Sequence, residues 1–285
     1  MTIKTMLVGA SGGSANDGAT ELACRLARRF EAHLEGLHVR PNPQDMILAA
    51  GAGFGMPLPG EWIDQVNAEA AETATKTKAA FAAAVGRHGL AMVEAPRSGA
   101  TASWREETGY AAETMARRAR FHDLIVLGRS ERVVDRPSTD TIEETLIHSG
   151  RPVLIAPAKP PATLGTTIAI GWNGSPEAVR VVVAARPLLA VANSVFIVVV
   201  GEKHEASGAS LQEYLAWHGI KSVLRHHPMV SGAGAGGQVL SAARDEGADM
   251  LVMGGYGRTP WRELLLGGAT REIVGVSLLP LLMSH

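Results

Sequence analysis

The 285-residue sequence has only one cysteine, Cys24, which excludes an intramolecular disulfide and any Cys-x-x-Cys redox or zinc site. Cys24 lies in a helical pattern beside Leu22 and Leu26, so we interpret it as a small buried apolar residue. No apolar run approaches the roughly 20 residues that span a bilayer, and the N-terminus lacks the apolar segment of a signal peptide. We therefore expect a cytoplasmic protein with no membrane partner.

The sequence also lacks an excess of charge of either sign. Its formal net charge is −1 at neutral pH. A protein that binds nucleic acid generally needs a basic face to neutralise phosphates, so this balance argues against a nucleic-acid partner. Hydrophobic residues make up 46% of the chain, which is enough to bury a core, and the length suits one large domain or two ordinary ones.

Apolar runs alternate with helical patterns along the whole chain. A long segment without periodicity, residues 41–60, is typical of a lid, an interface segment or a disordered loop. Strands that alternate with helices form parallel sheets through right-handed crossovers, with helices on both faces. In the first half, the pattern predicts strands at 5–10, 33–39, 90–96, 123–128 and 152–156, and helices at 17–32, 63–88, 110–120 and 142–149.

The order of elements repeats after a proline-containing linker at 158–162. His122–Gly128 matches Ala248–Gly254 position for position, and Gly150–Ala156 matches Leu278–Ser284. The spacing between the matched segments is that of a whole domain, not of a solenoid unit. We therefore predict two doubly wound α/β domains at residues 1–158 and 163–285. The second has expected strands at 167–171, 194–200, 222–227, 249–254 and 279–283, and expected helices at 177–189, 212–218, 238–246 and 270–276.

A glycine-rich loop follows the fourth strand of the second half. Gly254, Gly257 and Gly267 are separated by two and then nine residues. Glycine allows the backbone to approach a ligand closely, and Gly267 and Gly268 come just before a helix whose first N–H groups can bind phosphate. Arg258 could add positive charge. Because ligands of such sheets bind beyond the carboxyl ends of the strands, the pattern predicts a phosphate site here.

This spacing resembles the nucleotide loop of universal stress proteins, G-x2-G-x9-G-[S/T]. The run Gly171-Trp-Asn-Gly-Ser175 also resembles that family. The resemblance implies two flavodoxin-like domains of the adenine nucleotide alpha hydrolase-like type, each with a five-stranded parallel sheet. It implies that the two domains pack about a pseudo-twofold axis as an intramolecular pseudo-dimer, with the strands near Pro152–Ala156 and Pro280–Ser284 as candidate contacts. Two chains could also pair as a homodimer.

The same resemblance implies a function and a set of site residues. It implies a stress-response sensor or regulatory module that binds ATP in its second half. Adenine contacts would come from Asn173 and from the backbone near Val199. Phosphate and ribose contacts would come from the loop, at Gly254, Gly257, Arg258, Gly267, Gly268, Ala269 and Thr270.

Two positions of the second half depart from the family pattern. Gly268 stands where the family has a hydroxyl residue, and a lost hydrogen bond to a charged group costs about 1.5–3 kcal/mol. Thr270 lies two residues further on, where its hydroxyl could compensate for this loss. Asn173 stands where the family has an acid, so it can bind base or ribose only without charge. The first half departs further, since Glu131 replaces the second glycine and would repel phosphate. We therefore expect no ATP in the first half.

Other kinds of site fit the sequence less well. Gly232–Gly237 satisfies G-x-G-x-x-G, but it follows the third strand of its half and not the first, as a dinucleotide site would. The ten histidines show no ligand spacing, so no metal set is evident. No residue is an evident general base, so catalysis would be at most slow ATP hydrolysis. The alternative is a pseudo-dimeric adaptor that binds a protein or a non-nucleotide ligand.

Overall fold

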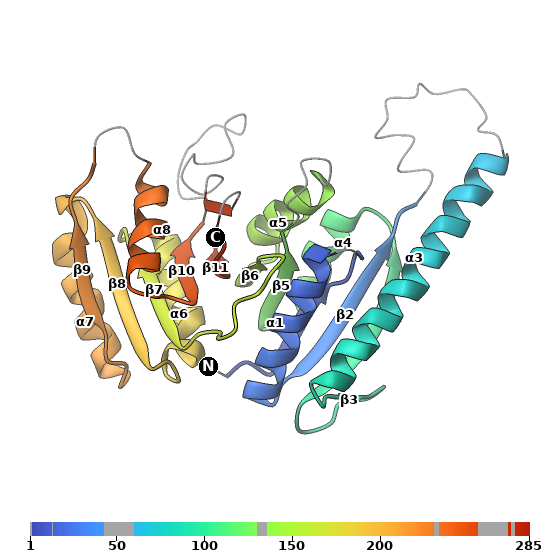
Figure 1. The fold of residues 1–285 in the computed structure, drawn as a ribbon, viewed down its shortest axis with the longest axis horizontal. Coiled ribbons are helices and arrows are strands. Elements are labelled where there is room, and N and C mark those ends of the chain that lie inside the picture. The colour runs from blue at the N-terminus through green and yellow to red at the C-terminus, as the bar shows by residue number, and fades with distance from the viewer. Residues whose placement is uncertain are drawn as a thin grey trace.

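The computed structural model describes residues 2–12, 14–42, 60–129, 136–230, 234–255, 273–274 and 277–285. Its strands form one 11-stranded sheet in the order β3-β4-β2-β1-β5-β6-β11-β10-β7-β8-β9 (Figure 1). The strands are β1 (Thr5–Gly9), β2 (His33–Arg40), β3 (Ala91–Met92), β4 (Thr101–Thr108), β5 (Leu124–Gly128), β6 (Val153–Ala156), β7 (Thr167–Gly171), β8 (Ser194–Val200), β9 (Val223–His227), β10 (Met250–Gly254) and β11 (Leu281–Ser284).

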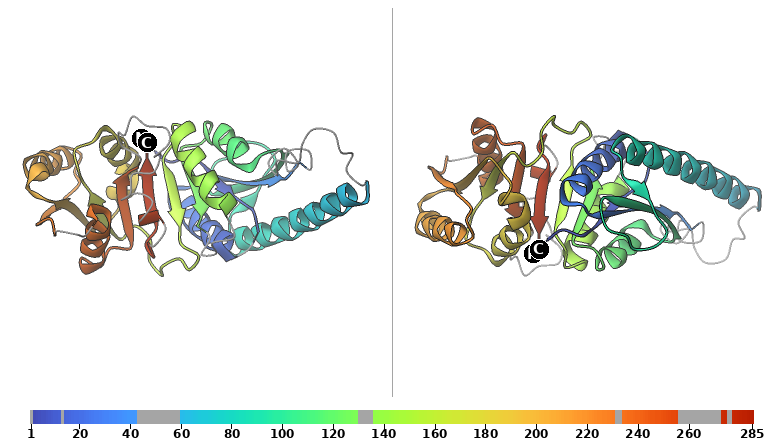
Figure 2. Two further views of the ribbon diagram at one scale, coloured as in Figure 1. Left: turned by 90° about the horizontal axis from the view of Figure 1, so that it is seen from above. Right: turned by 90° about the horizontal axis from the view of Figure 1, so that it is seen from below.

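Helices cover both faces of this sheet, as the views from above and below show (Figure 2). They are α1 (Ser14–Phe30), α3 (Gly60–Arg87), α4 (Ala111–Ala119), α5 (Arg136–His148), α6 (Pro176–Leu189), the 3-10 helix η1 (Glu202–His204), α7 (Glu205–Trp217) and α8 (Ala235–Asp245). Because both faces are covered, the central strands are apolar almost throughout. One core lies under α1, α3, α6 and α7, and the other under α4, α5 and α8.

The two halves of the sheet share one strand order, β4-β2-β1-β5-β6 in the first and β9-β8-β7-β10-β11 in the second. Within each half, neighbouring strands run parallel. The predicted fold class, flavodoxin-like and doubly wound, is confirmed. The halves meet where β6 and β11 pair antiparallel, with Leu282 opposite Leu154. These are the two terminal strands proposed from the sequence for that contact. The domain limits at 158 and 163 stay a prediction.

The third strand of the first half is placed wrongly by the sequence pattern. The pattern predicts residues 90–96, but β3 covers only Ala91–Met92, and β4, eight residues long, pairs with β2. The sequence of β4 is polar and mostly exposed towards its end, so it lacks the apolar run of a buried strand. Among the described residues, the first half therefore has one short edge strand more than the second half, joined to β4 by residues 93–100.

Two arginines of α1 hold the linker between the halves. Arg25 donates to the carbonyl oxygens of Pro161 and Ala162, and Arg29 Nη1 donates to Leu164 O at 2.9 Å. Arg29 Nη2 also donates to Val191 O at 2.9 Å, in the second half. The linker is thus bound to the first half by charge-assisted hydrogen bonds along its length.

Candidate functional site

The topology places the switch point of the second half between β7 and β10. From β7 the chain continues to β8 on one side and later returns to β10 on the other, so the connections diverge at this point. Such a switch point, beyond the carboxyl ends of the strands, is where open α/β sheets bind ligands. Gly171 of β7 pairs with Met253 of β10, so the segments that follow these strands leave the sheet side by side.

The segment after β7 is fixed by its own hydrogen bonds. Asn173 is exposed, and its Oδ1 accepts from the Ser175 backbone N–H at 3.1 Å. Ser175 caps α6, since its Oγ accepts from the Ala178 N–H at 3.2 Å. Trp172 packs against the core and donates from Nε1 to Ser207 Oγ at 3.1 Å. Asn173 is therefore held at the switch point, while Trp172 is a packing residue.

Gly254, the first glycine of the predicted loop, ends β10 directly beneath α6. A Cβ atom added there would lie 2.6 Å from the backbone nitrogen of Ala178 and 2.9 Å from the carbonyl carbon of Glu177. Neither backbone atom can move without shifting the helix. This glycine thus has a packing reason of its own, separate from any ligand.

Glu177, in the first turn of α6, was not singled out by the sequence. Its side chain is buried, Oε1 accepts from Arg180 Nη2 at 2.9 Å, and Oε2 has no hydrogen-bond partner. Burial raises the pKa of this carboxyl. Hydrogen bonds from its own N–H and from Ser175, together with the charges of Arg180 and His285, lower the pKa by more than burial raises it. The net pKa is below the ordinary value, so a negative charge sits beside Gly254. A buried carboxylate oxygen without a hydrogen-bond partner beside Gly254 indicates a candidate site residue, and only the structure reveals it.

The remaining predicted residues fall into two groups. Val199 lies in β8 with its side chain fully buried in the core, so only its backbone is available near this edge of the sheet. Asn173, Val199 and Gly254 come from three adjacent strands at the same edge. The other predicted site residues lie outside the described part of the chain: Gly257, Arg258, Gly267, Gly268, Ala269 and Thr270.

The first half has the same backbone at this edge with different side chains. The Ala10 N–H donates to Leu37 O at 2.8 Å, as the Trp172 N–H donates to Val198 O at 2.9 Å. After β5, however, Arg129 stands where the second half has Gly255. Arg129 is 9% exposed, and its Nη1 donates to Val274 O at 3.0 Å, in the second half. This arginine joins the halves at the position where a nucleotide loop would begin.

The described residues show neither a metal-ligand cluster nor a membrane-spanning helix. No group of three or more His, Cys, Asp or Glu side chains among them could hold a metal ion. Over the same ranges, every helix is too short or too polar to cross a membrane.

Comparison with known proteins finds similarity to universal stress proteins. No family model matches the chain. A stretch of 46 residues is 37% identical to Universal stress protein MJ0577 of Methanocaldococcus jannaschii, which is 16% of this chain and only 28% of that relative's length. A universal stress protein from Archaeoglobus fulgidus superposes with a TM-score of 0.71 at 16% identity, over 99% of this chain and 96% of that one. The chain has the fold of universal stress proteins.

A second solved structure agrees. A putative universal stress protein from Pseudomonas aeruginosa UCBPP-PA14 superposes with a TM-score of 0.58 at 15% identity, covering 98% of this chain and 92% of that chain. The likeness extends over nearly the full length of both solved proteins, so it includes both halves of the sheet. At these identities the likeness concerns the fold, not the ligand.

Proposed function

We propose that the chain is a universal stress protein whose second half binds ATP or a related nucleotide, as a sensor or regulatory module. The observation that carries the proposal is the placement of Asn173 and Gly254 at one switch point, at the ends of adjacent parallel strands. The glycine spacing that begins at Gly254 and the fold shared with universal stress proteins support it. Because the chain shows no evident general base, we propose binding rather than efficient catalysis.

The residues at the carboxyl ends of β7 and β10 are compatible with a neutral nucleobase and a phosphate chain. Asn173 is exposed and oriented by its hydrogen bond to Ser175, so its amide can meet a base or ribose without reorganising. Phosphate would bind the loop amides that precede the helix after Gly268. The ionised Glu177 would repel a phosphate on its side of the switch point and so favours one orientation of an anionic ligand.

The first half supports the proposal by contrast. Arg129 is committed to Val274 O, and Glu131 replaces the second glycine of the loop. A carboxylate at that place would repel phosphate, so the first half is proposed to serve as a structural partner.

Calorimetric titration of the full chain with ATP tests this proposal. We expect saturable heat at or below millimolar nucleotide, and we expect Gly257→Glu, which copies Glu131, to abolish it. The matched control is Glu131→Gly, which should leave ATP binding unchanged because the site belongs to the second half. Absence of heat from the folded wild-type chain would reject nucleotide binding and would favour the alternative, a pseudo-dimeric adaptor for a protein or a non-nucleotide ligand.

A further inference from the structure

A large cavity lies in the first half at the amino ends of β1, β2 and β4, whereas the proposed nucleotide site lies in the second half at the carboxyl ends of β7 and β10. Its volume is about 980 Å³, within the range of small-molecule sites. Its walls include Lys4 and Thr5 before and at the start of β1, His33 at the start of β2, and the segment 92–99 that leads from β3 to β4. The carboxyl ends of the same strands point to the other edge, so this cavity is separate from the switch point.

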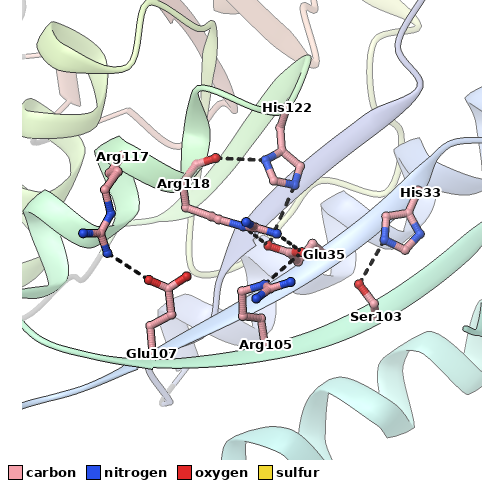
Figure 3. A network of polar contacts seen from close by, with 8 residues as sticks. All are labelled: His33, Glu35, Ser103, Arg105, Glu107, Arg117, Arg118 and His122. Atoms are coloured by element: carbon pink, nitrogen blue, oxygen red, sulfur yellow. Dashed lines mark hydrogen bonds and ion pairs between the residues drawn. The ribbon is translucent and has the colours of Figure 1, made fainter. Parts of the chain in front are cut away.

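A buried carboxylate, Glu35, lies in the wall of this cavity. Figure 3 shows the polar side chains around it. Glu35 of β2 is 6% exposed, and Arg118 donates to both of its oxygens, from Nε at 2.6 Å and from Nη2 at 2.7 Å. Arg105 Nε donates to Glu35 Oε2 at 3.4 Å, and His122 Nε2 lies 3.9 Å from Oε1. Beside this group, His33 Nε2 and Ser103 Oγ are 2.9 Å apart. Six polar side chains therefore gather on one sheet face.

The second half shows that the fold does not require these polar groups. The strand register places Glu35 opposite Leu7, and Phe196 opposite Ala169 at the corresponding position of the second half. By the same register, Ser103 corresponds to Val223, and His122 corresponds to Ala248. Buried ion pairs are often no more stable than well-packed apolar residues. The second half keeps an arginine here, Arg225, which pairs with Glu246, but it has apolar residues in place of Glu35, Ser103 and His122. These three polar residues are therefore candidates for a function other than folding.

The charges around the cavity favour an anion. Four lining residues are cationic, Lys4, Lys78, Arg97 and Arg105, and three are acidic, Glu31, Glu35 and Glu94. Arg118 already neutralises Glu35, which leaves four cations against two carboxylates.

Two of these cations have free donors. The Arg105 side chain is 45% exposed and touches Glu35 only through Nε, so its terminal nitrogens stay free to form a planar pair with an oxyanion. Within the described ranges, the Arg97 side chain has no hydrogen bond or ion pair.

We propose that this cavity binds a small organic anion, whose carboxylate or phosphate group pairs with Arg105 and Arg97 and whose apolar body contacts the wall formed by Met92, Val93 and Pro96. Glu35 is a positioning residue, since it holds Arg105 on the sheet face while Arg118 satisfies its charge. The inserted segment 93–100, which has no counterpart in the second half, forms one wall. The ligand class is set by the guanidinium geometry, which suits flat, bidentate oxyanions.

Three matched probe molecules test whether the ligand is a small organic anion. Benzoate and phenyl phosphate share an apolar ring and differ in the oxyanion, whereas benzamide has the shape of benzoate without its charge. Saturation-transfer NMR is performed on the full chain carrying Gly257→Glu, the variant proposed to abolish nucleotide binding. It should give a Kd for at least one anion. Benzamide should bind about tenfold more weakly or worse. The tighter of the two anions identifies the carboxylate or the phosphate as the preferred group.

Variants then locate the binding. Arg105→Gln and Arg97→Gln should each weaken the preferred anion by about tenfold, with thermal unfolding unchanged because both side chains are substantially exposed. The control is Arg225→Gln, since Arg225 is the register equivalent of Arg105 in the second half. Equal binding of benzamide, no binding of either anion, or an equal loss with Arg225→Gln would each overturn the proposal. Loss of ATP heat alone would not affect it.

Discussion

The two halves place different partners around equivalent arginines of one sheet face. In the first half, Arg105 contacts the carboxylate of Glu35, whereas in the second half Arg225 lies over the ring of Phe196, with its guanidinium carbon 5.4 Å from the ring centroid. The arginine pairs with a carboxylate in both halves, since Arg225 Nε donates to Glu246 Oε1 at 2.5 Å, but the residue at the register position of Glu35 changes from charged to aromatic. The shared fold therefore fixes where side chains meet and leaves open what they bind, so each half needs its own functional argument.

The largest effect on stability should come from removing the carboxylate of Glu35. Glu35→Ala removes the carboxylate from the mostly buried Arg118 guanidinium, so we expect the free energy of unfolding to fall by about 2–3 kcal/mol. Glu35→Phe, which copies the second half, should cost about 1 kcal/mol less, because Arg105 can then lie over the ring. Urea unfolding of the two variants measures the difference. Equal losses would mean that the ring does not restore the contact.

The first helix of each half also meets the segment after its last strand, but in different ways. In α6, Arg180 Nε donates to His285 O at 2.8 Å. In α1, the contact is steric: a Cβ on Gly18 would lie 2.5 Å from Pro157 O and 2.8 Å from Ala158 O. In the second half a side chain makes this contact, whereas in the first half the lack of a side chain at Gly18 allows it.

Gly18→Ala should therefore destabilise the chain by about 2 kcal/mol, since a methyl group would push against backbone oxygens of the linker. Gly86→Ala in α3 is the control, because nothing lies within 4 Å of its Cβ position. That change should raise the free energy of unfolding by up to about 1 kcal/mol through helix propensity. Denaturant unfolding of both variants checks the pair, and a neutral Gly18→Ala would show that the linker yields to the added methyl.

The sequence predicted what depends on local pattern. Apolar runs and the matched segments at His122–Gly128 and Ala248–Gly254 were enough for the fold class, because buried parallel strands have a strong apolar signal. The polar β4 was missed because its pairing with β2 is a long-range contact that no local pattern encodes. For the same reason, Glu35 and Arg118, which are 83 residues apart, could not be joined by inspection. Asn173 was assigned from the family resemblance after the first strand of its half, and its role in a site stays a prediction.

The titratable groups of the two halves offer a smaller test. His122 is 5% exposed, and its Nδ1 lies 3.2 Å from Arg118 O, so it fits a neutral ring that donates to that carbonyl. Burial lowers the pKa of His122, although the Glu35 charge opposes this. Because the unfolded chain takes up this proton first, stability present above pH 6.5 is lost as the pH falls below it.

His122→Ala, which copies Ala248, should therefore reduce the loss of stability between pH 7.5 and pH 5.5. The change is at most about 1.4 kcal/mol per pH unit for one histidine. Burial of Glu35 opposes the hydrogen bond and charge of Arg118, and the net effect lowers its pKa. The stability that this carboxyl contributes is fully present above pH 4.5 and is lost only below it, outside the window. Urea midpoints at the two pH values give the slope, and identical slopes for wild type and variant would assign the loss to other histidines.

The smallest effect on stability, and the clearest on reactivity, concerns Cys24. In the first half α3 packs against α1, and Cys24 is fully buried there, whereas Val179 on α6 of the second half is 47% exposed. Burial raises the pKa of the Cys24 thiol to about 12, with a further contribution from Glu21. Because the thiolate is the reactive form, Cys24 should resist a disulfide reagent at pH 8 until the chain unfolds. Val179→Cys in a Cys24→Ala background should react at once, and rapid labelling of native Cys24 would mean that α3 opens from α1 on the labelling timescale.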